Sequence, residues 1–312
     1  MATVDDYKSD TDILDEVLEA EQQFFEAVED AASGHIPIVI AKGPPGVGKS
    51  FGVNAICTAT GVESIDLIGS EFQERDEGGY PYNCVNLRRV PGAVRRGSDY
   101  ATWALVADLY GNREGGVINM EDNDRVLKDD VFVGLLMQAT ELTARRPIAY
   151  AKAQSTHELQ FRGVESTFDF AGSIIITTNI KMLEAVQKAR QEQEKSNGRR
   201  NPPAYIERWA ALMSRGSYVD LQMNSPRSVR VYCENKIEST KMLMQSAYLL
   251  SNFGRCLTQE ENDTAVKWLR HHQRDLQIPL DLRTYNKLAG IMIHRADTWE
   301  KSARVRLLNR GV

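Results

Sequence analysis

An octapeptide in the first fifth of the chain limits the possible folds more than any other stretch. It matches the phosphate-loop pattern G-x-x-x-x-G-K-[ST] at every fixed position, and its residues are Gly43, Pro44, Pro45, Gly46, Val47, Gly48, Lys49 and Ser50. Residues 35–41 before it predict a short buried strand, and residues 51–59 after it predict a helix with Lys49 and Ser50 in its first turn. Strand, loop and helix in this order favour a phosphate site over a chance glycine-rich turn.

The loop residues have distinct expected roles. Glycines let successive backbone N–H groups turn inward, and the start of the following helix adds its dipole, so the loop can surround a polyphosphate. The Lys49 ammonium is expected to reach the β- and γ-phosphates, and the Ser50 hydroxyl is expected to ligate Mg²⁺. The sequence therefore predicts a site for a nucleoside triphosphate with magnesium.

Strands and helices alternate along the chain up to residue 221, which predicts an α/β fold with a parallel sheet in three layers. Ser225 and Pro226 then form a strong helix start, and everything after them has a helical pattern, in segments 225–250, 258–275 and 282–308. We expect an N-terminal helix or linker (1–32), a phosphate-loop core (33–223) and a small all-helical domain (224–312).

Composition narrows the classes of partner. The net charge of −5 argues against a generally basic surface that coats nucleic acid, although a local basic groove is compatible with it. The four cysteines lie far apart and show no metal-binding spacing. No apolar run approaches membrane-spanning length, and the N-terminus lacks the apolar core of a signal peptide. We expect a cytoplasmic protein without a membrane partner.

Polar side chains end two further apolar segments. Residues 117–120 lead into Glu121 and Asp122, and residues 173–178 lead into Asn179. Parallel strands deliver their C-terminal residues to one crevice, where hydrolysis needs a carboxylate near Mg²⁺ and a group that orients water. Glu121 and Asp122 suit these roles, and the Asn179 amide can hold the attacking water. The alternatives are a solvated strand end for the carboxylates and a turn residue for Asn179.

From about residue 12 onward, the chain resembles the AAA+ ATPases, as a single-module member of MoxR-like or phage/plasmid type. Residues 120–125 (MEDNDR) look like the family's Walker B segment, normally D-E-x-D-R after an apolar strand, and Thr177-Thr178-Asn179 looks like its sensor-1 strand end. The resemblance implies ATP and Mg²⁺ as cofactors, Glu121 as the metal-associated carboxylate and Asp122 as the catalytic one. The two carboxylates are swapped, and Asp122 is one methylene shorter than the family's Glu. This bears on the hydrolysis rate and not on nucleotide binding.

The resemblance also assigns arginines. Residues 211–215 (ALMSR) are similar to the segment whose Arg serves as an arginine finger in the neighbouring subunit, which implies that role for Arg215. Residues 280–284 (LDLRT) are similar to the start of the helix that carries sensor 2, which implies that Arg283 touches the γ-phosphate; Arg227 and Arg230 are rivals. A finger that acts in trans implies a head-to-tail ring or arc, most simply a homo-hexamer.

The substrate depends on residues 71–97, where the family has an insertion that faces a central channel. Tyr80 and Tyr82 could grip an extended polypeptide, whereas Arg88 and Arg89, with a second arginine pair at 95–96, could hold a phosphate backbone. Both sets could instead be loop packing and solvated charge. A hairpin expected over 147–171 resembles one in MoxR-like chaperones, which favours a remodeller with a protein substrate or adaptor. A nucleic-acid motor or helicase/recombinase loader that uses residues 88–96, and an ATP-dependent scaffold with slow hydrolysis, remain the alternatives.

Overall fold

The computed structural model describes residues 7–62, 64–68, 97–121, 124–143, 145–150, 164–196 and 201–308, with the side chains of 64–68, 97–101, 103 and 104 left aside. Contacts divide the chain into two compact units. The sheet unit comprises residues 22–42 and 49–221, and the helical unit comprises residues 1–21, 43–48 and 222–312. The domain boundaries predicted from the sequence, after residues 32 and 223, stay predictions.

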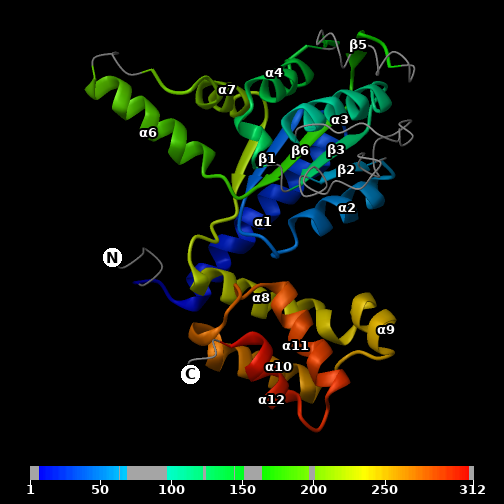
Figure 1. Ribbon diagram of the computed structural model, residues 1–312, viewed down its shortest axis with the longest axis vertical. Coiled ribbons are helices and arrows are strands. Elements are labelled where there is room, and N and C mark those ends of the chain that lie inside the picture. Colours follow the sequence, from blue (N-terminus) through cyan, green and yellow to red (C-terminus); the bar gives the residue numbers. More distant parts are fainter. Residues whose placement is uncertain are drawn as a thin grey trace. The chain divides into compact units, whose positions relative to one another are not determined.

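The sheet unit is built on a five-stranded sheet in which every neighbouring pair is parallel (Figure 1). Its strand order is β2-β3-β6-β1-β7. The bounds are β1 Ile38–Lys42, β2 Ser64–Ile68, β3 Val117–Glu121, β6 Ser173–Thr178 and β7 Ser217–Asp220. The parallel α/β sheet predicted from the alternating pattern is confirmed, and β1, the strand before the glycine-rich loop, lies inside the sheet.

Helices lie on both faces of this sheet. Alternate side chains of the central strands, such as Ile40, Ile118 and Ile176, join one core cluster with buried residues from α3, α4, α6 and α7. On the other face, Gly52 of α2 lies against the Phe25 ring of α1, where a Cβ atom would come within 2.5 Å of that ring. The helices are α1 Asp10–Ala32, α2 Lys49–Thr60, α3 Gly97–Gly111, α4 Asp130–Ala139, α6 Met182–Lys195 and α7 Ala204–Met213, with a 3₁₀ turn at Val126–Lys128.

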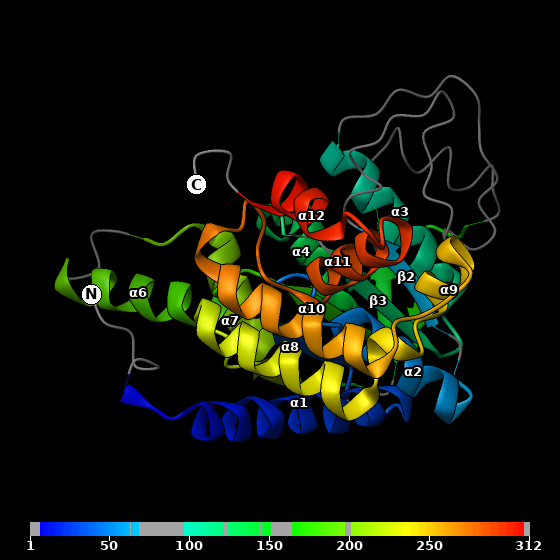
Figure 2. The ribbon, with the colours of Figure 1, turned by 90° about the horizontal axis from the view of Figure 1, so that it is seen from below.

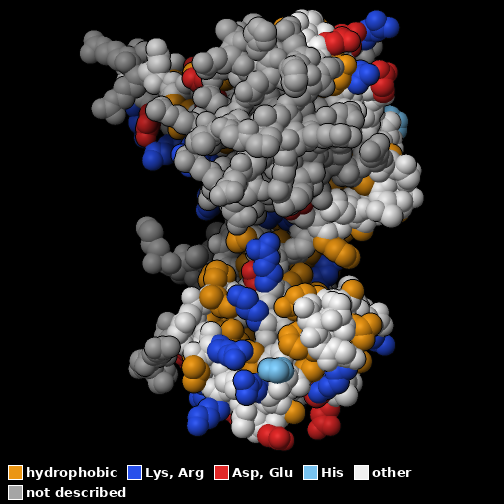
Figure 3. Space-filling view, turned by 45° about the vertical axis from the view of Figure 1, so that its right-hand side comes forward, with side chains coloured by type: hydrophobic (Ala, Val, Ile, Leu, Met, Phe, Trp, Pro, Cys, Tyr) orange, Lys and Arg blue, Asp and Glu red, His pale blue; other side chains and the backbone are white. Residues whose placement is uncertain are grey.

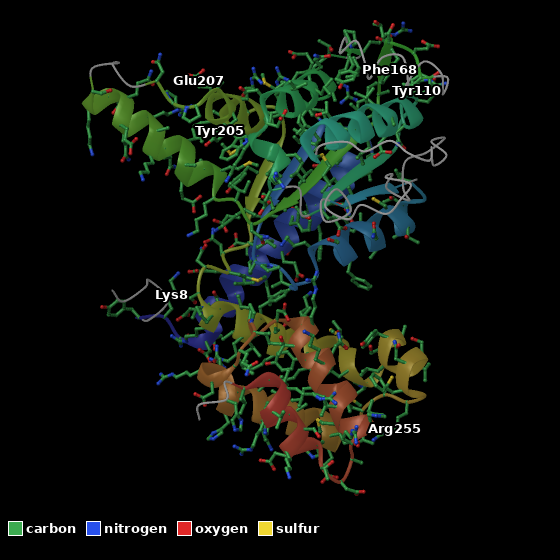
Figure 4. The ribbon with its side chains drawn as sticks, viewed as in Figure 1. Lys8, Tyr110, Phe168, Tyr205, Glu207 and Arg255 are labelled. Carbon is green, nitrogen blue, oxygen red and sulfur yellow. The ribbon has the colours of Figure 1, made fainter. Side chains whose placement is uncertain are left out.

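A two-stranded antiparallel pair, β4 (Arg146–Ala149) with β5 (Thr167–Phe170), occupies the two ends of the predicted hairpin. The buried Arg146 guanidinium fixes this pair, because it donates hydrogen bonds to the carbonyls of Ala139, Phe170 and Gly172. Burial lowers the pKa of this guanidinium. Phe168 also meets Tyr110 of α3 edge-on at 5.1 Å between ring centroids (Figure 4).

The helical unit contains five α-helices after residue 221: α8 Pro226–Thr240, α9 Ala247–Phe253, α10 Gln259–His272, α11 Leu282–His294 and α12 Trp299–Leu307. Short 3₁₀ turns lie at Met242–Met244 and Gln273–Asp275. Two segments predicted as single helices are therefore broken. The segment 225–250 ends its first helix at Lys241, which has a left-handed φ of 50°. The segment 282–308 is interrupted between His294 and Trp299.

Ion pairs hold α8 to its neighbours in the helical unit. The first half of α1 contacts α8, because the Tyr232 hydroxyl donates to the buried Glu21 carboxylate and Lys236 pairs with the same carboxylate at 2.7 Å. On its other flank, Glu234 of α8 pairs with Arg270 of α10 at 2.6 Å, and these two helices lie side by side (Figure 2). Among the described helices, none is long and apolar enough to cross a membrane.

A capping box begins α10. The Thr258 side chain accepts a hydrogen bond from the Glu261 backbone N–H, and the Glu261 carboxylate accepts one from the Thr258 backbone N–H at 2.9 Å. The Arg255 guanidinium donates two hydrogen bonds of 2.8 Å each to the same carboxylate (Figure 4 labels Arg255). The hydrogen bonds from Arg255 lower the pKa of Glu261 to about 2 from its usual 4.5.

This capping box makes the stability of the helical unit depend on pH. Because the pKa of Glu261 is lower in the folded state, its carboxylate stabilises the fold above pH 4.5, and this contribution is lost as the pH falls toward about 2. Glu261→Gln should lower the free energy of unfolding by about 1 kcal/mol at neutral pH. The difference from the wild type should shrink across that acid range in urea titrations. Glu260→Gln, an exposed neighbour in the same turn, is the matched control; an equal effect of both variants would contradict the assignment.

Candidate functional site

The register of the sheet brings three strand ends to one edge. Thr177 of β6 lies opposite Ala41 of β1 on one side and opposite Glu121 of β3 on the other. Because all three strands are parallel, the residues that follow them leave the sheet at the same edge. The phosphate-loop strand, the predicted Walker B strand and the predicted sensor-1 strand thus converge there, with Glu121 and Asn179 among their last residues.

The Glu121 carboxylate is positioned by its own strand. Asn119, two residues earlier on the same face, is fully buried and its side-chain amide donates to Glu121 Oε1 at 2.8 Å. This hydrogen bond restricts the orientation of the Glu121 carboxylate at the end of β3. The sequence analysis did not assign Asn119 a role, although a buried Asn within an otherwise apolar strand (VINME) was the available signal.

Asp124 fixes the end of β6. Its carboxylate accepts a short hydrogen bond from the Thr178 hydroxyl and a longer one, 3.4 Å, from the Asn179 backbone N–H. The Thr178 oxygen also accepts from the Ile180 N–H at 3.0 Å. Asp124 therefore connects the segment after β3 to the end of β6 through two hydrogen bonds. From the sequence, Asp124 had no assigned role beyond its place in the D-E-x-D-R pattern.

The two residues with assigned phosphate and metal roles begin a helix, as predicted. Lys49 and Ser50 are the first residues of α2. At the other end of the loop, Lys42 closes β1 and its ammonium is buried, 2.9 Å from the Asp220 carboxylate on β7. Lys42 is thereby tied to the adjacent strand, and the loop motif assigns the expected phosphate contact to Lys49.

The loop itself has the backbone that its glycines permit. Gly46 and Gly48 have φ values of 76° and 93°, in the left-handed region that residues with a Cβ rarely adopt. Gly43 and Gly48 are the fixed glycines of the motif, whereas Gly46 occupies a position where the general pattern accepts any residue. The structure shows that this chain needs glycine there as well.

The reason is a contact with the start of α11 inside the helical unit. The Gly46 carbonyl accepts a hydrogen bond from the Leu282 N–H at 3.1 Å. A Cβ atom on Gly46 would lie 2.0 Å from Asp281 Oδ2. The other carboxylate oxygen of Asp281 caps α11, because it accepts from the Thr284 N–H at 2.8 Å. The phosphate loop and the cap of α11 thus fit against each other, an arrangement that the sequence analysis did not foresee.

The arginine assigned as sensor 2 is exposed in the first turn of α11, directly after this contact. Arg283 follows Leu282, whose N–H holds the loop carbonyl. Its rivals are engaged elsewhere, since Arg227 and Arg230 pair with Asp10 of α1 at 2.6 and 2.9 Å. Of the three arginines, Arg283 is therefore the one that lies next to the loop residues 43–48 within the helical unit.

Arg215 is not brought to the edge where Glu121 lies. It precedes β7, so it lies at the opposite edge of the sheet, roughly 13 Å away along the strand direction. Its guanidinium is mostly buried against the end of α4, where it pairs with the Glu141 carboxylate at 2.7 Å and donates to the Met137 carbonyl. A cation at a helix C-terminus is favourable. Within its own chain, Arg215 therefore serves to hold the end of α4.

Five predicted site residues lie outside the described residues: Asp122, Tyr80, Tyr82, Arg88 and Arg89. In the part of the chain that the structure describes, no group of three or more His, Cys, Asp or Glu side chains could hold a metal. Magnesium at a phosphate site does not require one, because it is held by one or two protein oxygens together with waters and phosphate oxygens. The Ser50 hydroxyl and the Glu121 carboxylate fit that donor set.

Comparison with known proteins gives distant likenesses. No protein-family model matches the chain, and no curated protein matches it. NtrX from Brucella abortus in complex with ATP is similar over 89% of this chain and 51% of its own, with a TM-score of 0.45 and 14% identity. This chain thus spans about half the length of that one. A candidate ATPase from Cytophaga hutchinsonii is similar over 96% of this chain and 85% of its own, with a TM-score of 0.27 and 11% identity. These likenesses are too distant to assign a family.

The contact between Gly46 and Asp281 can be tested with a matched pair of glycines. Gly46→Ala should weaken binding of a fluorescent ATP analogue at least about tenfold, because the loop must shift away from the α11 cap and the left-handed φ is strained. Gly61→Ala is the control, since Gly61 has a similar φ of 69° but nothing within 4 Å of an added Cβ. Equal affinity of the two variants would show that the Asp281 contact has no effect on the loop.

Proposed function

We propose that this protein is an AAA+ ATPase that binds and hydrolyses ATP with Mg²⁺ and works in a ring-shaped or arc-shaped homo-oligomer. One observation carries the proposal: the strand that leads into the phosphate loop ends at the same edge of the sheet as the strand that ends at Glu121 and the strand that Asn179 follows. A glycine-rich loop alone fits many phosphate-binding proteins, whereas a carboxylate and an amide at the same edge supply the groups that hydrolysis needs.

We assign each group the role that its position in the motifs implies. The loop N–H groups and Lys49 bind the phosphates, and Ser50 and Glu121 hold Mg²⁺, which neutralises charge on the phosphate oxygens when bound. Asp122, directly after Glu121, is the proposed base, and the Asn179 amide orients the attacking water. Asn119 and Asp124 are positioning residues, because they fix Glu121 and the end of β6 through hydrogen bonds.

The position of Arg215 favours a site shared between subunits. It lies at the opposite edge of the sheet from Glu121, so we propose that it reaches the γ-phosphate of a neighbouring copy, where an arginine stabilises transition-state charge. In a head-to-tail assembly, each copy supplies the pocket on one side and the arginine on the other. Such an arrangement closes into a ring, proposed here as a hexamer, or extends as an arc.

For the substrate, we propose a protein that is remodelled, as in MoxR-like chaperones, because the hairpin containing β4 and β5 resembles theirs. A nucleic-acid motor remains the second candidate through the arginines of residues 88–96. The rate of ATP turnover, measured with and without DNA, separates the two candidates. A salt-sensitive, several-fold stimulation by single- or double-stranded DNA would overturn the protein-remodelling proposal.

Turnover separates hydrolysis from binding. Asp122→Asn should bind ATP with near wild-type affinity but lose turnover by about 10² or more, because the amide cannot accept the proton of water. Lys49→Ala should lose both binding and turnover. Phosphate release and binding of a fluorescent ATP analogue measure the two properties, and Asp15→Asn, an exposed carboxylate on α1, is the control. Unchanged turnover of Asp122→Asn would reject Asp122 as the base. Absence of turnover in the wild type, with binding intact, would favour a scaffold.

Arg215 is tested by mixing subunits. Arg215→Ala should bind ATP normally and lose turnover by about 10³ or more. A mixture of Arg215→Ala with Lys49→Ala should recover part of the activity, because one subunit keeps its pocket and the other keeps its arginine. Arg190→Ala, an exposed arginine on α6, is the matched control. Because Arg215→Ala also removes the ion pair with Glu141, thermal melts show whether the variant is destabilised. A stable Arg215→Ala protein that hydrolyses ATP at the wild-type rate would contradict the trans role.

A further inference from the structure

An open cavity lies in the helical unit, away from the phosphate loop in the sequence. Its volume is about 280 Å³. Side chains of α9, α11 and α12, with the segment before α11, form its apolar walls: Tyr248, Phe253, Ile278, Ile291 and Leu307. A cavity of this size accommodates one or two large apolar side chains.

The apolar surface continues from the cavity to the outside. Gly290 lets the Phe253 ring approach α11, because an added Cβ would lie 2.8 Å from that ring. The Tyr248 ring meets Phe253 edge-on at 6.4 Å between centroids, yet Tyr248 itself stays 55% exposed. Tyr248 is thus an exposed apolar side chain at the rim of the cavity.

The polar part of the cavity is cationic. Lys287, His294 and Arg306 line it, and none of the described lining residues is acidic. Within the described residues, Lys287 and Arg306 make no ion pair. Residues 222–312 carry 15 Lys and Arg against nine Asp and Glu, although the whole chain has a net charge of −5. Figure 3 shows a face of this unit on which Lys and Arg side chains lie among hydrophobic ones, next to a histidine.

One polar atom in the cavity wall lacks a partner. The Asn286 side-chain oxygen is buried and accepts no hydrogen bond in the structure. A buried acceptor without a donor costs about 1–3 kcal/mol.

We propose that this cavity docks an acidic, amphipathic segment of a partner protein. A Leu or Phe side chain of the segment enters between Tyr248 and Ile291, and its carboxylates pair with Lys287 and Arg306. The aliphatic part of the walls, formed by Ile278, Ile291 and Leu307, suits an apolar peptide side chain, whereas single-stranded nucleic acid relies on aromatic faces for base stacking. This site does not rest on ATP hydrolysis, so it can stand or fall separately from the proposed function.

The test measures peptide binding to the full-length chain by fluorescence anisotropy. The probe is a labelled synthetic peptide with Leu and Phe at helical spacing and Glu at the remaining positions, and a version with Lys in place of Glu is the charge control. Tyr248→Ala and Arg306→Glu should each weaken binding at least about tenfold, equal to about 1.4 kcal/mol. Lys301→Glu, an exposed charge reversal on α12 outside the cavity, should change the affinity by less than about twofold.

The remaining outcomes decide the proposal. Binding that depends on Tyr248 and Arg306 but not on Lys301, and that the Lys peptide does not reproduce, supports it. It is overturned if the Glu peptide does not bind, or if the two cavity variants, shown by thermal melts to be folded, bind like the wild type. It is also overturned if single-stranded oligo-dT displaces the peptide and shows the same dependence on both residues, since the surface would then belong to a nucleic acid.

Discussion

The candidate site depends on the backbone ladder between β1, β6 and β3. Thr177 has Ala41 on one side and Glu121 on the other, so three chain segments that are far apart in sequence end at one level. A register shift of one residue in a strand turns its side chains to the opposite face. The apolar residues of β6 are buried along its whole length, which makes such a shift costly and fixes where Glu121 and Asn179 emerge.

Around this ladder, a second layer of hydrogen bonds positions the polar groups. Asn119 holds Glu121 from within the same strand, and Asp124 holds Thr178 from the adjacent segment. Arg215, which precedes β7, is not part of this layer, because it pairs with Glu141 and donates a hydrogen bond at the end of α4. In the proposed assembly, the γ-phosphate of a neighbouring copy would have to compete with that local carboxylate for Arg215.

Much of the fold follows from local patterns, and the rest does not. Apolar runs bounded by turn residues predicted β1, β3 and β6, and the loop motif predicted the start of α2 at Lys49. The break after α8 was not predicted, because Lys241 adopts a left-handed conformation without the glycine that usually signals one. Asp281 was read only as a neighbour of Arg283. Its contact with Gly46 joins residues that are far apart in sequence, and no local spacing encodes such a contact.

The fit between Gly46 and Asp281 has a consequence for sequence variation. The phosphate-loop pattern leaves the Gly46 position open, so a substitution there would ordinarily be judged neutral. In this chain the Asp281 carboxylate, which caps α11, leaves no room for a Cβ atom at position 46. A larger residue in the loop would require a smaller cap, such as Ser, at position 281. In a set of sequences with this architecture, the two positions should therefore vary together rather than independently.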